Sequence, residues 1–331
     1  MRVLVTGGAG YIGSHAVREL LETGHEVTVL DDLSEGHRAA VPRAARLVVG
    51  DLADREALGQ SLSGAGAVMH FAARAYVGES VRDPAAYYRT NVAKALELLW
   101  ATIEAGVRRF VFSSTCAVYG DPRQVPMQES HPRRPINPYG ATKLAFERAL
   151  EDHAATGALR VVALRYFNAA GCHPDGSLGE HHDPETHLIP LAIDAATGAG
   201  PRLTIFGDDY ETPDGTCIRD YVHVTDLSRA HVQALDVSEA GAAFRAFNLG
   251  SETGSSVLEV VRAVERVTGR KVETTRGARR PGDPPRLVAS AAEARAALGF
   301  APRFAELETI VESAYRWRRQ HPRGYHEEAR A

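Results

Sequence analysis

Short apolar runs alternate with longer amphipathic segments through the first half of the 331-residue chain. The apolar runs predict buried strands at residues 3–5, 26–30, 45–49, 67–71, 109–113 and 160–165. Between them, apolar residues at helical spacing predict helices at residues 11–22, 84–105 and 138–155. Because strands that alternate with crossover helices pair in parallel, this order predicts an α/β fold with a doubly wound (Rossmann) parallel sheet.

The pattern changes after about residue 168, where a loop-rich second half begins with many Gly, Pro and His residues at 171–190. Farther on, the spacing predicts helices at 189–197, 256–268, 291–298 and 304–320, and strands at 202–205 and 244–249. We predict a Rossmann domain at 1–167 and a smaller C-terminal α+β domain at 168–331, with segments near 219–250 returning to the first domain. The tail at 321–331 is expected to be loosely held.

Composition narrows the class of protein. Hydrophobic residues make up 44% of the chain and charged residues 24%, which is typical of a globular protein and excludes a disordered or fibrous one. The formal charge of −4 lacks the basic excess of a nucleic-acid-binding protein. Three cysteines are too few for a disulfide scaffold and favour a reducing compartment. No apolar run reaches ~18 residues and the N-terminus lacks a signal-peptide pattern, so we expect a cytoplasmic protein that contacts no membrane.

A glycine-rich loop joins the first predicted strand to the first predicted helix. Its glycines at positions 8, 10 and 13 fit G-x-G-x-x-G, and those at 7, 10 and 13 fit the wider G-x-x-G-x-x-G. Such glycines let a pyrophosphate approach the backbone at a helix N-terminus. Asp31 ends the second strand, 18 residues after Gly13, where a carboxylate binds the adenosine ribose and repels a 2′-phosphate. The loop therefore predicts NAD rather than NADP as cofactor. Asp51, after the third strand, is either an adenine contact or a surface turn residue.

Tyr139 and Lys143 are the candidate chemical residues. Asn137 is a good N-cap and Pro138 suits the first helical position, so Tyr139 and Lys143 lie one turn apart on one helical face. A free tyrosine has a pKa of ~10, and a nearby ammonium together with a positive nicotinamide ring would lower that pKa. The alternative is a core tyrosine and a solvated lysine. Only three of the 38 basic residues are lysines, so a lysine retained at 143 favours the catalytic interpretation, because arginine does not reproduce a compact point charge.

A run of hydroxyl residues ends the predicted strand at 109–113. In a doubly wound fold the ligand binds at the carboxyl ends of the strands. Thr115 is the best candidate to bond a substrate hydroxyl and relay its proton. The alternative is that these hydroxyls close backbone hydrogen bonds in a turn.

The motifs TGGAGYIGSH, DDLS, FSSTCAVYG, NPYGATK and LRYFNAAG together resemble the extended short-chain dehydrogenase/reductases. Within that group the chain is similar to the UDP-galactose (UDP-glucose) 4-epimerases. The likeness rests on the segments 71–73, 77–80, 214–224 and 280–283, which read FAA, VGES, DGTCIRDYVHV and RPGD. It extends over nearly the whole chain.

The resemblance implies a reversible epimerisation of UDP-galactose to UDP-glucose at C4 with a bound NAD that is regenerated in each turnover. Tyr139 would take the proton of the 4-hydroxyl while hydride leaves C4, and the 4-keto sugar would turn before hydride returns. The resemblance also implies a homodimer formed through the helices at 84–105 and 138–155, and a UDP-sugar as the partner molecule.

Site residues carry over position by position. The catalytic residues implied are Tyr139, Lys143 and Thr115. Cofactor contacts are implied at Gly7, Gly10, Tyr11, Ile12, Gly13, Asp31, Asp32, Asp51, Leu52, Phe71, Ala72, Ala73, Asn91, Ser113, Tyr139, Lys143 and Phe167. UDP-sugar contacts are implied at Thr115, Tyr139, Asn168, His187, Leu188, Thr204, Ile205, Phe206, Arg219, Arg280 and Asp283. Asp32 departs from the asparagine that is usual in the family.

Several alternatives are weighed against this interpretation. A 4,6-dehydratase needs an Asp-Glu pair directly after the threonine, and this chain has Cys116 and Ala117 there. A non-catalytic NAD sensor would be expected to lose Tyr139 or Lys143. By the same resemblance, Leu287 falls where family members differ in side-chain size near the sugar's 2-position, which leaves N-acetylated nucleotide sugars open.

Two further features are not expected to take part in the chemistry. The histidines 181, 182 and 187, with Asp183 and Glu185, match no common zinc spacing, so we expect a structural or substrate-lining loop and no metal. Cys116 has no evident activating base and is expected to be a small buried filler.

Overall fold

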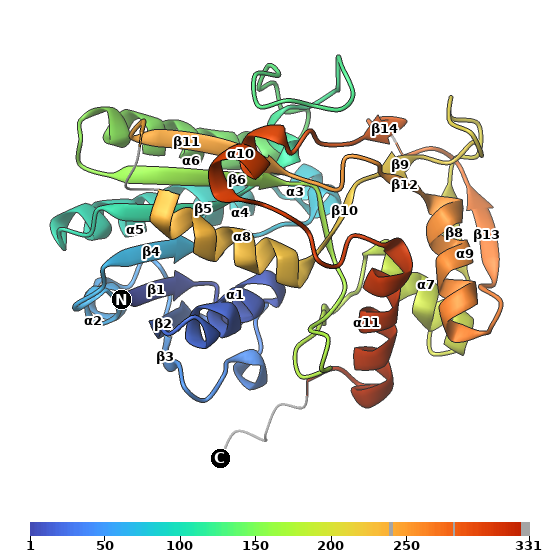
Figure 1. The fold of residues 1–331 in the computed structure, drawn as a ribbon, viewed down its shortest axis with the longest axis horizontal. Helices are drawn as coiled ribbons and strands as arrows, with labels where there is room; N and C mark the ends of the chain where they lie inside the picture. Colours follow the sequence, from blue (N-terminus) through green and yellow to red (C-terminus); the bar gives the residue numbers. More distant parts are fainter. Residues whose placement is uncertain (238–240, 281, 326–331) are drawn as a thin grey trace.

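Seven parallel strands form the central sheet of the computed structural model, which describes residues 1–237, 241–280 and 282–325 (Figure 1). The strand order is β11-β6-β5-β4-β1-β2-β3. The strands are β1 (Arg2–Thr6), β2 (Glu26–Asp31), β3 (Arg46–Val49), β4 (Ala67–His70), β5 (Arg109–Thr115), β6 (Arg160–Tyr166) and β11 (Phe244–Leu249). The sequence order reverses between β1 and β4, which is where doubly wound sheets open a crevice for a ligand. The predicted fold class is confirmed.

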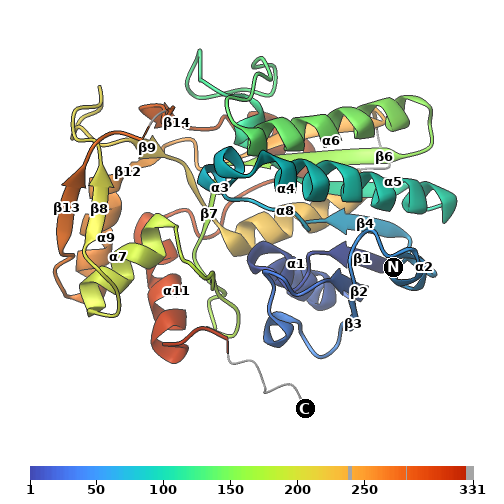
Figure 2. The same ribbon diagram turned by 180° about the vertical axis from the view of Figure 1, so that it is seen from behind.

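Helices cover both faces of the sheet (Figures 1 and 2). One face is covered by α1 (Tyr11–Glu22), α8 (Val224–Val237) and α10 (Ala292–Leu298), whose apolar sides share one hydrophobic core with the strands. The opposite face is covered by α2 (Arg55–Leu62), α5 (Ala95–Glu104) and α6 (Pro138–Ala155), which form a second core. The helix predicted at 84–105 is divided into α4 (Pro84–Tyr88), a π-helical segment η2 (Arg89–Lys94) and α5. Short turns complete this part: η1 (Arg38–Ala40), α3 (Val77–Arg82) and η3 (Cys116–Val118).

A smaller unit lies beyond the carboxyl ends of the strands (Figure 1). Its core is made where α7 (Leu188–Thr197), α9 (Val257–Thr268) and α11 (Leu307–Gln320) pack together. Short strands complete it as three small sheets: β7 (Asn168–Ala170) with β10 (Tyr221–His223); β8 (Leu203–Phe206) with β13 (Thr274–Gly277); and β12 (Ser255–Ser256), β9 (Ile218–Arg219) and β14 (Arg286–Leu287). The chain returns from this unit to the large sheet through α8 and β11, and again through α10.

Two details differ from the sequence-based expectations. The pattern analysis named no helix at 55–62 or 224–237, where α2 and α8 lie. The start of the tail is packed rather than loose, because the Tyr325 ring lies against Trp317 and its hydroxyl accepts a hydrogen bond from Gly179 N at 2.9 Å. Residues 326–331 of the predicted tail lie outside the described residues. In the described part of the chain, no helix is long and apolar enough to cross a membrane.

A buried ion pair fixes α6 against the sheet. Glu147 on α6 and Arg165 on β6 are 0% and 3% exposed. Arg165 donates to both Glu147 oxygens, at 3.0 and 2.7 Å, and Ser114 of β5 donates to the same carboxylate at 2.5 Å. Arg165 also donates to the Tyr119 hydroxyl at 3.0 Å, which donates in turn to Asn248 of β11 at 2.6 Å. The network therefore ties the helix to three neighbouring strands.

Replacing Glu147 by glutamine should strongly destabilise the fold, because it leaves the Arg165 charge buried without a counter-charge. We expect Glu147→Gln to lower the free energy of unfolding by about 3–5 kcal/mol. The control is Glu151→Gln on the same helix, which removes a part-exposed pair with Arg133 and should cost less than ~1 kcal/mol. Chemical denaturation of both variants measures the difference, and equal losses would contradict the structural role assigned to Glu147.

Candidate active site

The glycine-rich loop leads from β1 into α1, and two of its glycines are required by packing. Gly7 has a φ of +71°, and a Cβ there would lie 2.4 Å from Ala72 N. A Cβ on Gly13 would lie 2.1 Å from Gly7 O. At Gly10, by contrast, a Cβ would meet only Gly7 O, at 3.4 Å, so the space above the loop is open. Gly10 precedes α1 and has no side chain to cap its first N–H groups, which leaves Tyr11, Ile12 and Gly13 at an anion-binding helix start.

Asp31 closes this loop from the end of β2. Its carboxylate accepts hydrogen bonds from Ala9 N and Leu33 N, each at 2.9 Å. Burial raises the pKa of the Asp31 carboxyl, and these two hydrogen bonds oppose the rise. Each oxygen keeps a further acceptor lone pair. The residue therefore has the geometry to accept ribose hydroxyls without moving.

Two further carboxylates, those of Asp32 and Asp51, accept hydrogen bonds from residues within their own turns. Asp32 accepts hydrogen bonds from Ser34 N and Ser34 Oγ, at 2.9 and 2.6 Å. Asp51 forms an ion pair with Lys94 of η2 and also accepts from Ala53 N at 2.8 Å. Leu52 is buried in the core behind α2. Asp51 is thus paired within the turn after β3, while its contact with adenine stays a prediction. Lys94 accounts for a second of the three lysines.

The loop after β4 is held from inside by Asn91. Phe71 N and Ala72 N both donate to Thr6 O, which brings this loop, and Ala73 after it, next to the glycine loop. Asn91 is 3% exposed and bonds both the N–H and the carbonyl of Arg74, at 2.8 and 3.0 Å. Its amide also donates to Thr142 on α6 at 3.2 Å. Predicted as a cofactor contact, Asn91 uses most of its hydrogen-bonding capacity to clamp this loop to α6.

Tyr139 and Lys143 lie at the start of α6, over the end of β5. Asn137 caps the helix by accepting from Gly140 N at 2.9 Å, as its position predicts. Lys143 is 4% exposed, and its Nζ donates to Ser113 O at 3.0 Å and lies 5.0 Å from the centre of the Phe112 ring. Ser113 Oγ lies 2.6 Å from the Tyr166 hydroxyl. The structure therefore gathers tyrosine, lysine and strand-end hydroxyls at one place.

Burial dominates the titration of both groups. It raises the pKa of Tyr139 well above its ordinary value, the Tyr166 hydroxyl adds to the rise, and a hydrogen bond with Thr115 opposes it. Burial lowers the pKa of Lys143 to about 7, against the opposing charge of Glu147. The largest contributions to the pKa of Tyr139 come from burial and neighbouring side chains, and Lys143 is not among them. The lowering of this pKa by Lys143 together with a positive nicotinamide ring stays a prediction.

Thr115 has the turn-closing role, while its contact with a substrate hydroxyl stays a prediction. Its Oγ1 accepts from Ala117 N at 3.2 Å, which is the turn-closing role, and it also bonds Tyr139. Cys116 beside it has a pKa raised by burial to about 12, so it is not a thiolate nucleophile at neutral pH.

A second cluster lies on the smaller unit and gathers most of the predicted sugar-nucleotide contacts. Arg219 on β9 forms an ion pair with Asp283. The Arg280 guanidinium lies 4.2 Å from the centre of the Phe206 ring on β8. The pattern of β8 alternates, so Thr204 and Phe206 are exposed while Ile205 is 1% exposed and belongs to the core. An arginine pair beside an exposed aromatic ring and a carboxylate suits a phosphate, a base and a ribose.

Residues between the two clusters connect them. Phe167 is buried among Val118, Leu144 and neighbouring apolar side chains, and Asn168 opens β7 beside β10. Leu287 pairs in register with Arg219 and packs on the group that includes Cys116. The Tyr11 hydroxyl donates to Gly171 O at 2.5 Å, which joins the glycine loop to the smaller unit. Leu188 begins α7 and His187 precedes it.

Residue-by-residue reasoning missed several groups that build this site: Glu147, Arg165, Tyr166, Tyr87 and Glu180. Tyr87 is fully buried and its ring lies 6.4 Å from the ring of Tyr139. One signal was present in the sequence, since an arginine inside the apolar run at 160–165 implies a buried partner.

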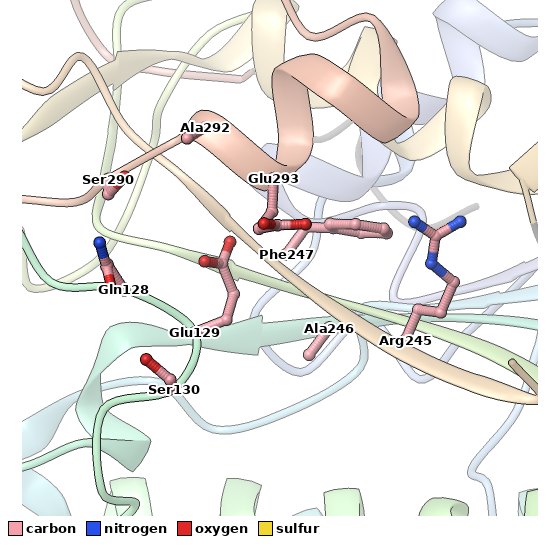
Figure 3. A pocket seen from close by; sticks show the side chains of 9 residues that line it. All are labelled: Gln128, Glu129, Ser130, Arg245, Ala246, Phe247, Ser290, Ala292 and Glu293. Atoms are coloured by element: carbon pink, nitrogen blue, oxygen red, sulfur yellow. The ribbon is translucent and has the colours of Figure 1, made fainter.

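A separate cavity of about 430 Å³ lies between β11, the start of α10 and the segment at 128–130 (Figure 3). Arg245 and Phe247 of β11 line it on one side and Glu129 lies on the other. None of the predicted site residues lines this cavity, so it is not part of the candidate active site.

The whole chain is similar to proteins of a known family, in sequence and in structure. The sequence profile of the NAD dependent epimerase/dehydratase family matches residues 3–250. The UDP-glucose 4-epimerase of Streptococcus mutans is 49% identical over 329 residues, which cover 98% of this chain and 99% of that protein. A crystal structure of UDP-glucose 4-epimerase from Brucella ovis in complex with NAD matches with a TM-score of 0.92 at 51% identity, covering 95% of this chain and 97% of that one. That of Bifidobacterium longum UDP-glucose 4-epimerase in complex with NAD+ and UDP matches with a TM-score of 0.93 at 36% identity, covering 98% of this chain and 100% of that one.

Adding one methyl group at Gly13 should disrupt the loop, because its Cβ and Gly7 O cannot lie 2.1 Å apart. We expect Gly13→Ala to lower the free energy of unfolding by about 1–3 kcal/mol and to weaken binding of added NAD. Gly59→Ala is the control, since a Cβ there meets nothing within 4 Å and should be neutral or stabilising. Denaturation and NAD titration test both variants; wild-type stability and affinity in Gly13→Ala would refute the packing argument.

Proposed function

The chain belongs to the NAD dependent epimerase/dehydratase family, and we propose that it interconverts UDP-galactose and UDP-glucose by inverting C4 of the sugar. The observation that carries the proposal is the meeting of Tyr139, Thr115 and Lys143 at the carboxyl end of β5, next to the glycine loop. The relatives that span nearly the whole chain are named UDP-glucose 4-epimerases, which supports the choice of substrate.

The residues around the glycine loop fit NAD. The open space above Gly10, the uncapped start of α1 and the acceptors of Asp31 match a pyrophosphate and an adenosine ribose. NAD supplies a reversible hydride acceptor, so that the sugar can be oxidised and reduced at the same carbon. Lys143 is proposed to donate a hydrogen bond from its ammonium to the ribose next to the nicotinamide.

Tyr139 is the proposed base and acid for the 4-hydroxyl of the sugar, and Thr115 is the proposed hydrogen-bond partner of that hydroxyl. Because burial opposes ionisation of Tyr139, the phenolate needs a nearby positive charge. The Lys143 ammonium is a candidate for this charge, but without a cofactor it donates its hydrogen bond to the Ser113 carbonyl. The base is therefore expected to become competent only when NAD is bound. Thr115 bonds Tyr139 already, so the proton has a short path between substrate and tyrosine.

The second cluster is proposed to hold the UDP part of the substrate. Arg219 and Arg280 can each donate charge-assisted hydrogen bonds to the diphosphate, Asp283 can accept from the uridine ribose, and Phe206 offers a face for the base. Asn168, His187 and Leu188 lie at the same end of the sheet. Binding the substrate mainly through UDP leaves the sugar free to turn between the two hydride transfers.

N-acetylated nucleotide sugars are a second candidate substrate class, because the leucine at position 287 does not decide between the two. Leu287 is half-buried against the apolar cluster that contains Phe167, and it pairs with the strand that carries Arg219. A smaller side chain there would leave more room at the sugar's 2-position. Comparing UDP-galactose with UDP-N-acetylgalactosamine as substrates distinguishes the two classes.

Replacing Tyr139 by phenylalanine should separate catalysis from binding. Because only the hydroxyl is lost, Tyr139→Phe is expected to keep NAD bound and to reduce turnover of UDP-galactose by on the order of 10²–10⁴-fold. Tyr88→Phe, a part-exposed tyrosine on α4, is the control. Turnover close to that of the wild type in Tyr139→Phe would rule out this residue as the base.

Removing Arg219 should weaken nucleotide binding more than it slows the chemical step. A lost charge-assisted contact costs about 1.5–3 kcal/mol, so Arg219→Ala should weaken UDP binding roughly ten- to a hundred-fold in a calorimetric titration. Arg266→Ala, which removes an exposed pair with Glu308, is the control. Unchanged UDP affinity would remove Arg219 from the binding site.

We also propose that the chain forms a homodimer through the face made by α4, α5 and α6, which lie side by side (Figure 2). Tyr88 and Trp100 are 47% and 45% exposed on this face, although large aromatic side chains are usually covered. Sedimentation velocity should show a dimer for the wild type and a smaller species for Trp100→Glu. A monomeric wild type would exclude the dimer.

A further inference from the structure

Four potential ligand residues converge in the loop that precedes α7. Glu180, His182, Glu185 and His187 come from eight consecutive positions, and one donor atom of each lies within 4.8 Å of all the others. His187 Nδ1 lies 2.9 Å from Glu185 Oε1 and 3.0 Å from Glu180 Oε1. His182 Nδ1 lies 3.5 Å from Glu180 Oε1 and 3.5 Å from Glu185 Oε2. The loop therefore wraps two imidazoles and two carboxylates around one point.

Three of the atoms directed at this point make no hydrogen bond of standard geometry within the described residues, and their nearest polar neighbours are the other members of the cluster. The three atoms are Glu180 Oε1, His182 Nδ1 and Glu185 Oε2, all buried. Glu180 is the deepest, with its side chain 5% exposed. Buried carboxylate and imidazole atoms without partners are costly, and native proteins rarely leave them so. An occupant that binds several of these atoms at once would remove that cost.

We propose that Glu180, His182, Glu185 and His187 form a binding site for a zinc-class divalent cation. Zinc takes imidazole nitrogen and carboxylate oxygen ligands at about 2.0–2.2 Å in a tetrahedron, which sets neighbouring ligand atoms about 3.3–3.6 Å apart. Four nitrogen–oxygen distances in the cluster are 2.9–3.5 Å, although they involve both Glu185 oxygens. One ligand atom of each residue lies within 4.8 Å of all the others, so modest side-chain movements would close the tetrahedron. Magnesium and calcium fit less well, because both prefer all-oxygen sites.

The chemistry of this site points to a structural cation. All four proposed ligands come from the protein, and a closed tetrahedral site leaves no position for a reacting water. The His182 ring lies 6.1 Å from the ring of Tyr11 in the glycine loop and 5.9 Å from that of Tyr76. The cation would thus fix the loop that carries His187 and Leu188 against the cofactor-binding half of the chain.

This proposal differs from the expectation of no metal, which rested on the spacing of the histidines in the sequence. Glu180 did not stand out in the sequence, and the pattern E-x-H-x-x-E-x-H matches no common zinc signature. Asp183 and His181, which did stand out, are not in the cluster; the His181 ring stacks instead on His37, 4.6 Å away.

The test is a metal analysis of the full-length protein, purified without added metal or chelator, and then stripped with EDTA and titrated with Zn²⁺ against a chromophoric chelator. The wild type should bind one tight Zn²⁺ per chain. Because loss of even an outer-shell partner costs about 10–100-fold in metal affinity, His182→Gln and Glu185→Gln should each lose about 100-fold or more. His181→Gln, from the same loop, is the matched control and should bind Zn²⁺ like the wild type.

The absorption spectrum of bound Co²⁺ provides a test on the wild type, so it does not require that any variant folds. Co²⁺ added to the stripped wild type should give the strong visible absorption of a tetrahedral site, and one equivalent of Zn²⁺ should abolish it. Absence of a tight site in the wild type, or equal Zn²⁺ binding by the wild type and His182→Gln, would overturn the proposal. Both readouts are independent of epimerase activity, so they stand or fall separately from the proposed function.

Discussion

The site depends first on the buried Glu147–Arg165 ion pair. Two charges removed from water are tolerated only when each is fully paired, and here Ser114, Tyr119 and Asn248 complete the hydrogen bonding. Tyr139, Lys143 and Glu147 recur every four residues, so they share one face of α6. Fixing Glu147 on β6 therefore also fixes the position of Tyr139 above β5. The Glu147 carboxylate in addition supports the charged form of Lys143 against burial.

The same burial that orders this helix also disfavours the ionised form of Tyr139, the residue that we propose as the base. The pKa of Tyr139 is raised, and the Lys143 ammonium is directed to a backbone carbonyl. We propose that the phenolate forms only when the positive charge of bound NAD is nearby. In the proposed mechanism this dependence would be useful, because the proton and the hydride leave the same alcohol, and the proton would be removed only where the hydride acceptor is present.

The sequence predicted the features that depend on residues close together in the chain. The six strands of the first half, the glycine loop, Asp31 and the cap at Asn137 follow from apolar runs, turn geometry and capping. The return of α8 and β11 to the sheet could be expected only in outline, since strand pairing across more than 70 residues leaves no local trace. The clamp by Asn91 and the convergence at Glu180 also rest on tertiary contacts. A paired arginine in an apolar strand was the one long-range feature that the sequence did signal, through Arg165.

The most direct test follows the hydrogen on C4 of the sugar. UDP-galactose carrying deuterium at C4 would be incubated with the purified protein without added cofactor, and the product analysed by NMR and mass spectrometry. The account predicts UDP-glucose that retains deuterium at C4, because hydride leaves and returns within one closed site that already holds NAD. UDP-glucose whose deuterium has been replaced by solvent hydrogen, or no conversion even after NAD is added, would contradict it.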